Sequence, residues 1–165
     1  SGGFEIGKEI EIAIQFNKGN SGKADKMLMD YYEKDSSRII DNLIEQFPEK
    51  SSITKEAHKC HKKGMYFAST ALFLIIADGL CEGNLYSRKD NKKALRKFFA
   101  TKNRIGGFRE VVTEPSAIDS PHHTRTKYPS SLNRHAALHG FDSEFGTKLN
   151  SFKALSLVAF ILDLT

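Results

Sequence analysis

The sequence has few cysteines and no long uninterrupted apolar run. Two cysteines, Cys60 and Cys81, are too few for the disulfide framework that supports small secreted domains. The longest strongly apolar stretch covers residues 65–77, and two hydroxyl side chains interrupt it. It is too short to cross a bilayer and fits a buried core helix. We therefore expect no membrane partner and a reducing, cytoplasmic location.

Targeting and repetitive segments are also missing. The sequence has no basic and apolar leader with a small-residue cleavage site, no internal repeat and no low-complexity tract. Ser1-Gly2-Gly3 is typical of an expression-tag remnant, which suggests a domain taken from a longer protein. The chain of 165 residues, with 39% hydrophobic and 27% charged residues, is ordinary for a globular protein. We predict a single domain over residues 4–165.

Acidic side chains become scarce along the chain. Residues 1–56 carry 8 Lys/Arg against 11 Asp/Glu, whereas residues 57–165 carry 17 against 9. A basic half beside an acidic half favours the docking of a polyanion on the basic one. A solvated basic surface explains the charge equally well, so charge alone does not decide between the two.

Apolar residues recur at three- and four-residue spacing, which predicts an all-α bundle of four to five main helices. Residues 4–16 fit a strand or a helix, and we favour a helix. The first long helix could break at Ser36-Ser37, and Pro48 ends it. Residues 17–23 are predicted as a loop. The other predicted helices cover residues 24–47, 51–81, 88–104, 131–139 and 147–163.

Two basic segments are candidates for RNA contact. The helix predicted over residues 88–104 has a single acid, and half of its basic side chains could contact RNA while the rest face solvent. Three of the four prolines fall within residues 113–131, which predicts a long loop of the kind that is often functional. This loop could grip RNA or be a flexible polar loop. The RNA-binding candidates in the two segments are Lys92, Lys93, Arg96, Lys97, Arg125 and Lys127.

The clearest chemistry lies in residues 133–140, which read Asn-Arg-His-Ala-Ala-Leu-His-Gly. A histidine transfers protons near neutral pH, and an arginine fork grips phosphate oxygens. RNA cleavage by its own 2′-hydroxyl needs both groups and no metal, because the substrate supplies the nucleophile. Positions five apart on a helix lie about 140° from one another, so Arg134 and His139 cannot share a face. Gly140 could let His139 swing round, or a partner subunit could complete the site. His135 and His139 do share a face.

The pattern of residues 134–139 resembles the signature of the HEPN superfamily, which is an arginine, a polar residue, three further residues and a histidine. Arg134, His135 and His139 match that pattern, and residues 65–81 and 128–163 are similar to bacterial HEPN-like proteins. The resemblance implies a HEPN-like helical bundle that forms a homodimer and acts as a metal-independent endoribonuclease in toxin–antitoxin or anti-phage defence. It implies that Arg134 binds phosphate, that His139 is the acid/base and that His135 supports them.

Other partners and functions follow from the same resemblance. An antitoxin or further domains of a longer chain would be additional partners beside RNA. The alternative function is a non-catalytic HEPN-like module that binds nucleic acid or serves as a scaffold in a larger defence protein. The last predicted helix is apolar on nearly every face, so a small bundle should leave part of it for a homodimer contact. Asn150 and Lys153 in that helix are expected to cap and to pack at the dimer.

Two further residues could support the site, and four others are of types that can bind zinc. Asp78 could orient an active-site Arg or His, or it could cap the turn at Gly79, and the sequence leaves both open. Asn133, directly before the arginine, is the second supporting residue that we expect. Zinc-ligand types occur, but their spacing fits no common zinc module, and the histidine pair lacks the glutamate of a zinc protease motif. We expect no metal and no cofactor. The zinc-ligand types are His58, Cys60, His61 and Cys81.

Overall fold

The computed structural model describes residues 11–12, 14–15, 18–86, 97 and 130–164, and all regular secondary structure within these ranges is helical. The predicted all-α class is therefore confirmed. The four described residues of the ambiguous segment 4–16 are helical. Of the helix predicted over residues 88–104, only Lys97 is described, and it is helical.

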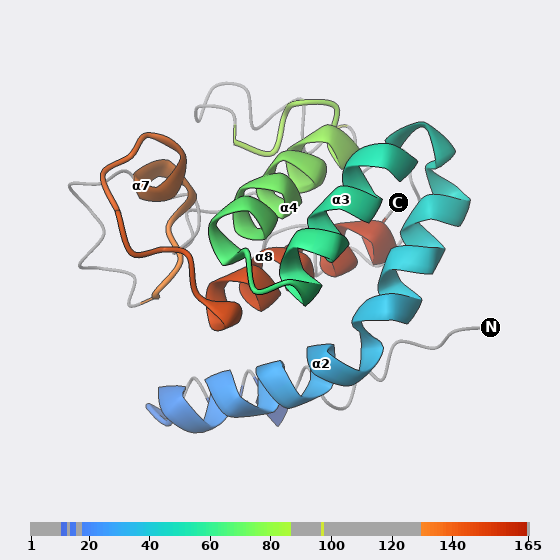
Figure 1. The fold of residues 1–165 in the computed structure, drawn as a ribbon. Coiled ribbons are helices and arrows are strands. Elements are labelled where there is room, and N and C mark those ends of the chain that lie inside the picture. The colour runs from blue at the N-terminus through green and yellow to red at the C-terminus, as the bar shows by residue number, and fades with distance from the viewer. Residues whose placement is uncertain (1–10, 13, 16–17, 87–96, 98–129, 165) are drawn as a thin grey trace.

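The first long helix, α2, covers Ser21–Gln46 and begins inside the segment predicted as a loop. Its backbone is helical through Ser36-Ser37, so the suggested break does not occur, although the helix bends between its blue and cyan parts (Figure 1). Pro48 then opens a short 3-10 helix, η1, over Pro48–Lys50. The apolar face of α2 enters the core through Tyr31, Tyr32, Ile39, Ile40 and Leu43.

The prediction of a single helix over residues 51–81 is wrong. The chain instead forms α3 (Ser51–Lys62) and α4 (Tyr66–Leu80), which pack against each other. Gly64 has a φ of 74°, the left-handed conformation that ends helices. The Gly64 N–H donates to the carbonyl of His61, and the Met65 N–H donates to that of Cys60 at 2.9 Å. These bonds satisfy the last carbonyls of α3, so the chain reverses into α4.

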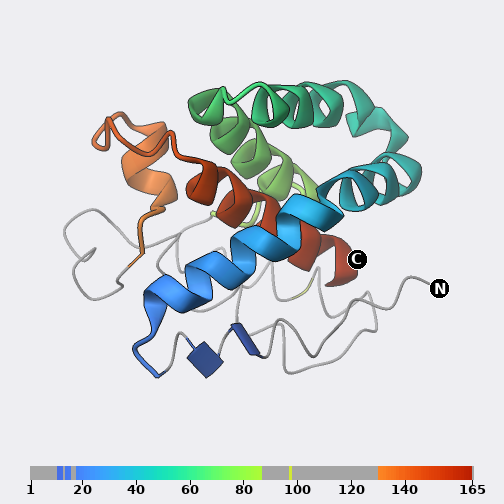
Figure 2. The same cartoon turned by 60° about the horizontal axis from the view of Figure 1, so that its bottom comes forward.

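The last helix, α8, covers Lys148–Leu164 and lies at the centre of the bundle, where it packs against α4 and α2 (Figure 2). Most of the largest side chains of the core come from α4 and α8, among them Phe73, Leu74, Phe152, Leu155 and Ile161, and Tyr32 and Leu43 of α2 join them. The apolar side chains of residues 149–162 are buried or half-buried within one chain. One bundle therefore covers most of α8, while Leu149, Leu157 and Phe160 keep part of their surface open, and the homodimer contact stays a prediction.

The short helix α7, Arg134–Leu138, lies on one flank of the bundle and contacts α4 (Figure 1). It carries most of the motif, and a loop connects it to α8. Within the described ranges, no helix combines the length and the apolar character that a membrane crossing requires.

Candidate functional site

The motif helix α7 begins at an asparagine cap. Asn133 has an extended backbone and is only 1% exposed. Its side-chain Oδ1 accepts a 2.8 Å hydrogen bond from the N–H of Ala136, which otherwise has no partner in the first turn. Asn133 therefore supports the site by fixing where α7 starts, and Arg134 is the first residue of the helix.

The same helix ends at a glycine, as the sequence predicts. Gly140 has a φ of 73°, and the Phe141 N–H donates to the carbonyl of Ala136 at 2.8 Å. The Gly140 N–H donates to the carbonyl of Ala137 at 3.3 Å. Together these bonds form the glycine-ended arrangement also found after α3. His139 is thus the residue at which the helix ends.

His135 and His139 lie together on one face of α7. Their ring centroids are 4.4 Å apart at an interplanar angle of 53°. The Phe141 ring lies beside both, at 6.0 Å from His135 and 6.4 Å from His139. His139 is exposed and His135 is half-buried. The shared face predicted for the two histidines is confirmed, and an imidazole pair faces solvent at the end of the helix.

The Arg134 side chain packs against other residues than the two histidines do. Its Cζ lies 4.3 Å from the centroid of the Tyr86 ring, and the side chain lines an open pocket of about 500 Å³. His139 is not among the residues that line this pocket. The two motif side chains therefore have different neighbours, as the five-residue spacing requires. The pocket is lined by Leu74, Ile75, Asp78, Gly83, Tyr86, Arg134 and Leu138.

Asp78 caps the turn that follows α4. Its Oδ1 accepts a 3.0 Å hydrogen bond from the N–H of Leu85, so the capping role is the observed one of the two alternatives. The carboxylate also lines the pocket with Arg134. Sequence reasoning missed Tyr86, whose hydroxyl donates to the carbonyl of Leu74 at 3.2 Å. The only signal was an aromatic residue shortly after the end of the core helix.

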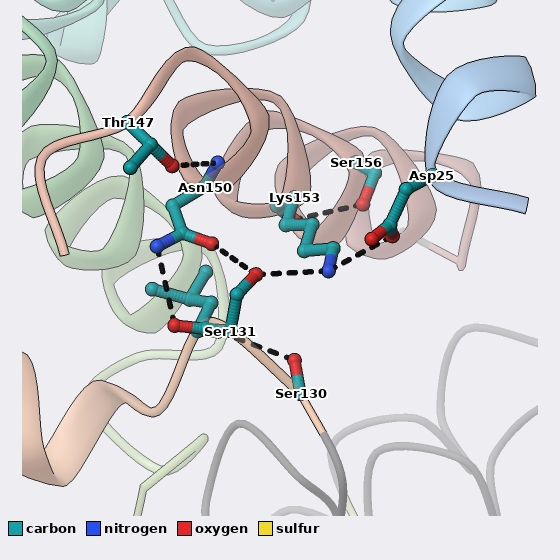
Figure 3. Close-up of polar contacts among 8 residues, drawn as sticks. Asp25, Ser130, Ser131, Thr147, Asn150, Lys153 and Ser156 are labelled. Carbon is teal, nitrogen blue, oxygen red and sulfur yellow. Dashed lines mark hydrogen bonds and ion pairs between the residues drawn. The ribbon is translucent and has the colours of Figure 1, made fainter. Parts of the chain in front are cut away.

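A polar cluster of Asp25, Ser131, Asn150 and Lys153 anchors the segment before α7 (Figure 3). The Ser131 hydroxyl donates to Asn150 Oδ1 at 2.6 Å and accepts from Lys153 Nζ at 3.0 Å. Lys153 Nζ also lies 3.0 Å from Asp25 Oδ1. The cluster therefore joins α2, α8 and the approach to the motif. Lys153 has a structural role, as expected, but inside one chain.

Asn150 ties together the two ends of the loop that contains α7. Its Nδ2 donates to the carbonyl of Ser131 at 3.2 Å and to that of Phe145 at 3.0 Å. Residues 131 and 145 lie on opposite sides of the motif in the sequence. Because Asn150 is 2% exposed and belongs to the core helix α8, it fixes the loop to the most buried part of the molecule.

Two of the zinc-ligand types on α3, Cys60 and His61, have other partners. His61 Nδ1 lies 2.8 Å from the hydroxyl of Ser151, which lies 2.7 Å from that of Ser69. Burial lowers the pKa of His61 to about 4. The Cys60 thiol donates to Glu56 Oε1 at 3.8 Å. Within the described part of the chain, no three His, Cys, Asp or Glu side chains form a group that could hold a metal ion.

The basic candidates are mostly outside the described residues. Lys97 is exposed. The other five RNA-binding candidates are not described, namely Lys92, Lys93, Arg96, Arg125 and Lys127.

Comparison with protein-family models, with curated proteins and with solved structures finds no match to this chain.

Proposed function

We propose that this protein is a metal-independent endoribonuclease of the HEPN type. The observation that carries the proposal is the pair of the half-buried His135 and the exposed His139, with ring centroids 4.4 Å apart on the helix that begins with Arg134. Imidazoles suit proton transfer near neutral pH, and a guanidinium suits phosphate. Cleavage of RNA by its 2′-hydroxyl requires those two capacities.

The roles follow from the chemistry of that cleavage. The 2′-oxygen attacks the adjacent phosphorus, the bond from phosphorus to the 5′-oxygen breaks, and a 2′,3′-cyclic phosphate and a 5′-hydroxyl remain. His139 transfers the protons, because it is the exposed member of the pair. Arg134 stabilises the extra negative charge on the crowded phosphate. His135 holds the His139 ring in place through their contact.

Assembly belongs to the same proposal. Leu138 and Phe141 flank the histidine pair and are 41% and 60% exposed. Exposed apolar side chains beside a site favour association, and a homodimer would place two motif helices together. A cytoplasmic role in toxin–antitoxin or anti-phage defence, with an antitoxin or further domains as partners, rests on the family resemblance of the motif.

The test uses the purified chain with single-stranded RNA in EDTA. We expect fragments that end in 2′,3′-cyclic phosphate, and we expect chelation to leave the rate unchanged. A His58→Ala variant is the matched control, since His58 lies on α3 and does not belong to the motif. It should cut as the wild type does, whereas His139→Ala should not.

A second outcome would favour the alternative function. RNA that is bound but left intact by the wild-type chain would assign the protein to the non-catalytic modules that bind nucleic acid or serve as scaffolds. Cleavage that stops in EDTA would instead require a metal that the proposal does not include.

A further inference from the structure

The pocket beside Arg134 has a composition suited to a flat, partly polar ligand. Its volume of about 500 Å³ is within the range of about 300–1,000 Å³ for small-molecule sites. Leu74, Ile75 and Leu138 supply apolar surface, while Asp78 supplies the acidic group. Ile75 and Leu138 are 50% and 41% exposed, so the apolar surface is open to a ligand.

Internal hydrogen bonds fix the walls of the pocket. The Tyr86 hydroxyl donates to the carbonyl of Leu74, and the Leu85 N–H donates to Asp78 Oδ1. Both bonds hold the turn after α4 against that helix. Arg134 then packs over the Tyr86 ring at 4.3 Å. A ligand would meet a preformed surface and would not have to order it, which lowers the cost of binding.

Asp78 can offer both carboxylate oxygens to a ligand. Its Oδ1 accepts from Leu85 and keeps a second lone pair, and no residue that the structure describes donates to Oδ2. An ionised carboxylate can only accept hydrogen bonds. The matching ligand therefore presents N–H donors on an edge and an apolar or aromatic face to the walls. A nucleobase of single-stranded RNA has this form, and such bases are recognised by stacking and by hydrogen bonds to their edges.

We propose that this pocket binds a guanine base of the RNA, next to the phosphate that is cleaved. Guanine is the one common base whose Watson–Crick edge offers two neighbouring donors, N1–H and the 2-amino group, to a carboxylate. Each of the other three bases offers a single donor group on its Watson–Crick edge. Because Arg134 lines the same pocket, the phosphate attached to the bound guanosine would meet the guanidinium. The proposal rests on the proposed ribonuclease function and adds its base preference.

The first experiment compares cleavage of RNAs that differ only in having G, A, C or U at one unpaired position. Wild type should cut beside G about 10- to 100-fold faster, the size expected of a bidentate contact. Asp78→Asn keeps an oxygen for Leu85 and replaces the free acceptor with a donor, so the preference for G should disappear. Glu82→Gln is the matched control, since it removes the same charge from an exposed side chain of the same turn, outside the pocket lining.

The second experiment needs no cleavage. Guanosine, adenosine, cytidine and uridine 5′-monophosphates are titrated into the full chain, and methyl NMR shifts of Leu74 and Leu138 report binding. GMP should bind more tightly than the other three in wild type and in Glu82→Gln, but not in Asp78→Asn.

The two experiments separate the proposals. Equal cleavage at all four bases, or a G preference that survives Asp78→Asn, overturns the guanine pocket and leaves the ribonuclease standing. Selective GMP binding that depends on Asp78, in a chain that cuts no RNA, supports the pocket and overturns the ribonuclease. A chain that neither cuts RNA nor prefers GMP overturns both.

Discussion

Asn150 donates a 3.2 Å hydrogen bond from its amide to the carbonyl of Ser131, and the same Nδ2 lies 3.0 Å from the carbonyl of Phe145. The core helix α8 thereby holds both ends of the loop that carries the motif. The positions of the motif side chains should therefore depend on this buried amide as much as on α7 itself, which has only five residues.

Replacement of Asn150 by alanine should loosen this loop. The change removes three part-buried side-chain hydrogen bonds and leaves the carbonyl groups of Ser131 and Phe145 without this donor, at a cost of about 2–4 kcal/mol in the free energy of unfolding. Asn150→Asp keeps the acceptor for Ser131 but points an anion at two carbonyls, so it should not restore the wild-type stability. Urea unfolding measures both variants. Wild-type stability in Asn150→Ala would contradict the anchoring role.

The ion pair of Asp25 and Lys153 should contribute more than an exposed pair. Their side chains are 30% and 15% exposed, against 31% and 43% for Asp35 and Arg38 on α2. A double-mutant cycle with Asp25→Asn and Lys153→Met should give a coupling of about 0.5–1 kcal/mol that falls with added salt. The cycle on Asp35 and Arg38 serves as the control and should give less. Equal couplings would show that burial adds nothing here.

Alanine substitutions at two glycines with the same backbone geometry should distinguish an effect on stability from an effect on RNA cleavage. Gly64 and Gly140 both have positive φ, and a Cβ at either position would meet no atom within 4 Å. Alanine at each should therefore cost a similar amount, about 1–2 kcal/mol, from the left-handed conformation alone. Only Gly140→Ala should also lower RNA cleavage, since His139 directly precedes it. Equal cleavage by the two variants at matched folded fraction would argue against a role for the end of α7.

Acid should destabilise the fold through His61. Burial lowers its pKa from 6.5 to about 4, so the unfolded chain binds a proton between these values while the folded chain does not. The contribution of this pKa difference to the free energy of unfolding is complete above pH 6.5 and is lost as the pH falls toward 4, with a total on the order of 3 kcal/mol. Unfolding midpoints across this window should decline, and His61→Gln should flatten the decline. An NMR titration that finds an ordinary pKa for His61 would refute the explanation.

Local chemistry made much of the fold predictable. Asn133 and Gly140 are ordinary start and stop signals, and the structure uses both to bound α7. Gly64 carries the same kind of signal, but the periodic residues on either side of it fit one continuous helix. The sequence therefore could not show that the chain reverses there. Only packing decides that α3 folds back on α4.

The candidate site was predictable only where its residues are neighbours in sequence. His135 and His139 share a face because of their four-residue spacing. The Tyr86 ring under Arg134, and the amide of Asn150 between Ser131 and Phe145, depend on contacts between separate elements. Such contacts follow from how α4, α7 and α8 pack, and no local pattern encodes them.

The measurement that tests the ribonuclease most directly is the single-turnover rate of RNA cleavage in EDTA for wild type, Arg134→Ala, His139→Ala and the double variant. Each single change should lower the rate by about 10²–10⁴, with His139→Ala still binding RNA and Arg134→Ala binding it more weakly. Circular dichroism should show that all four remain helical. A double variant that cuts RNA at the wild-type rate would contradict the assignment of these two residues to catalysis.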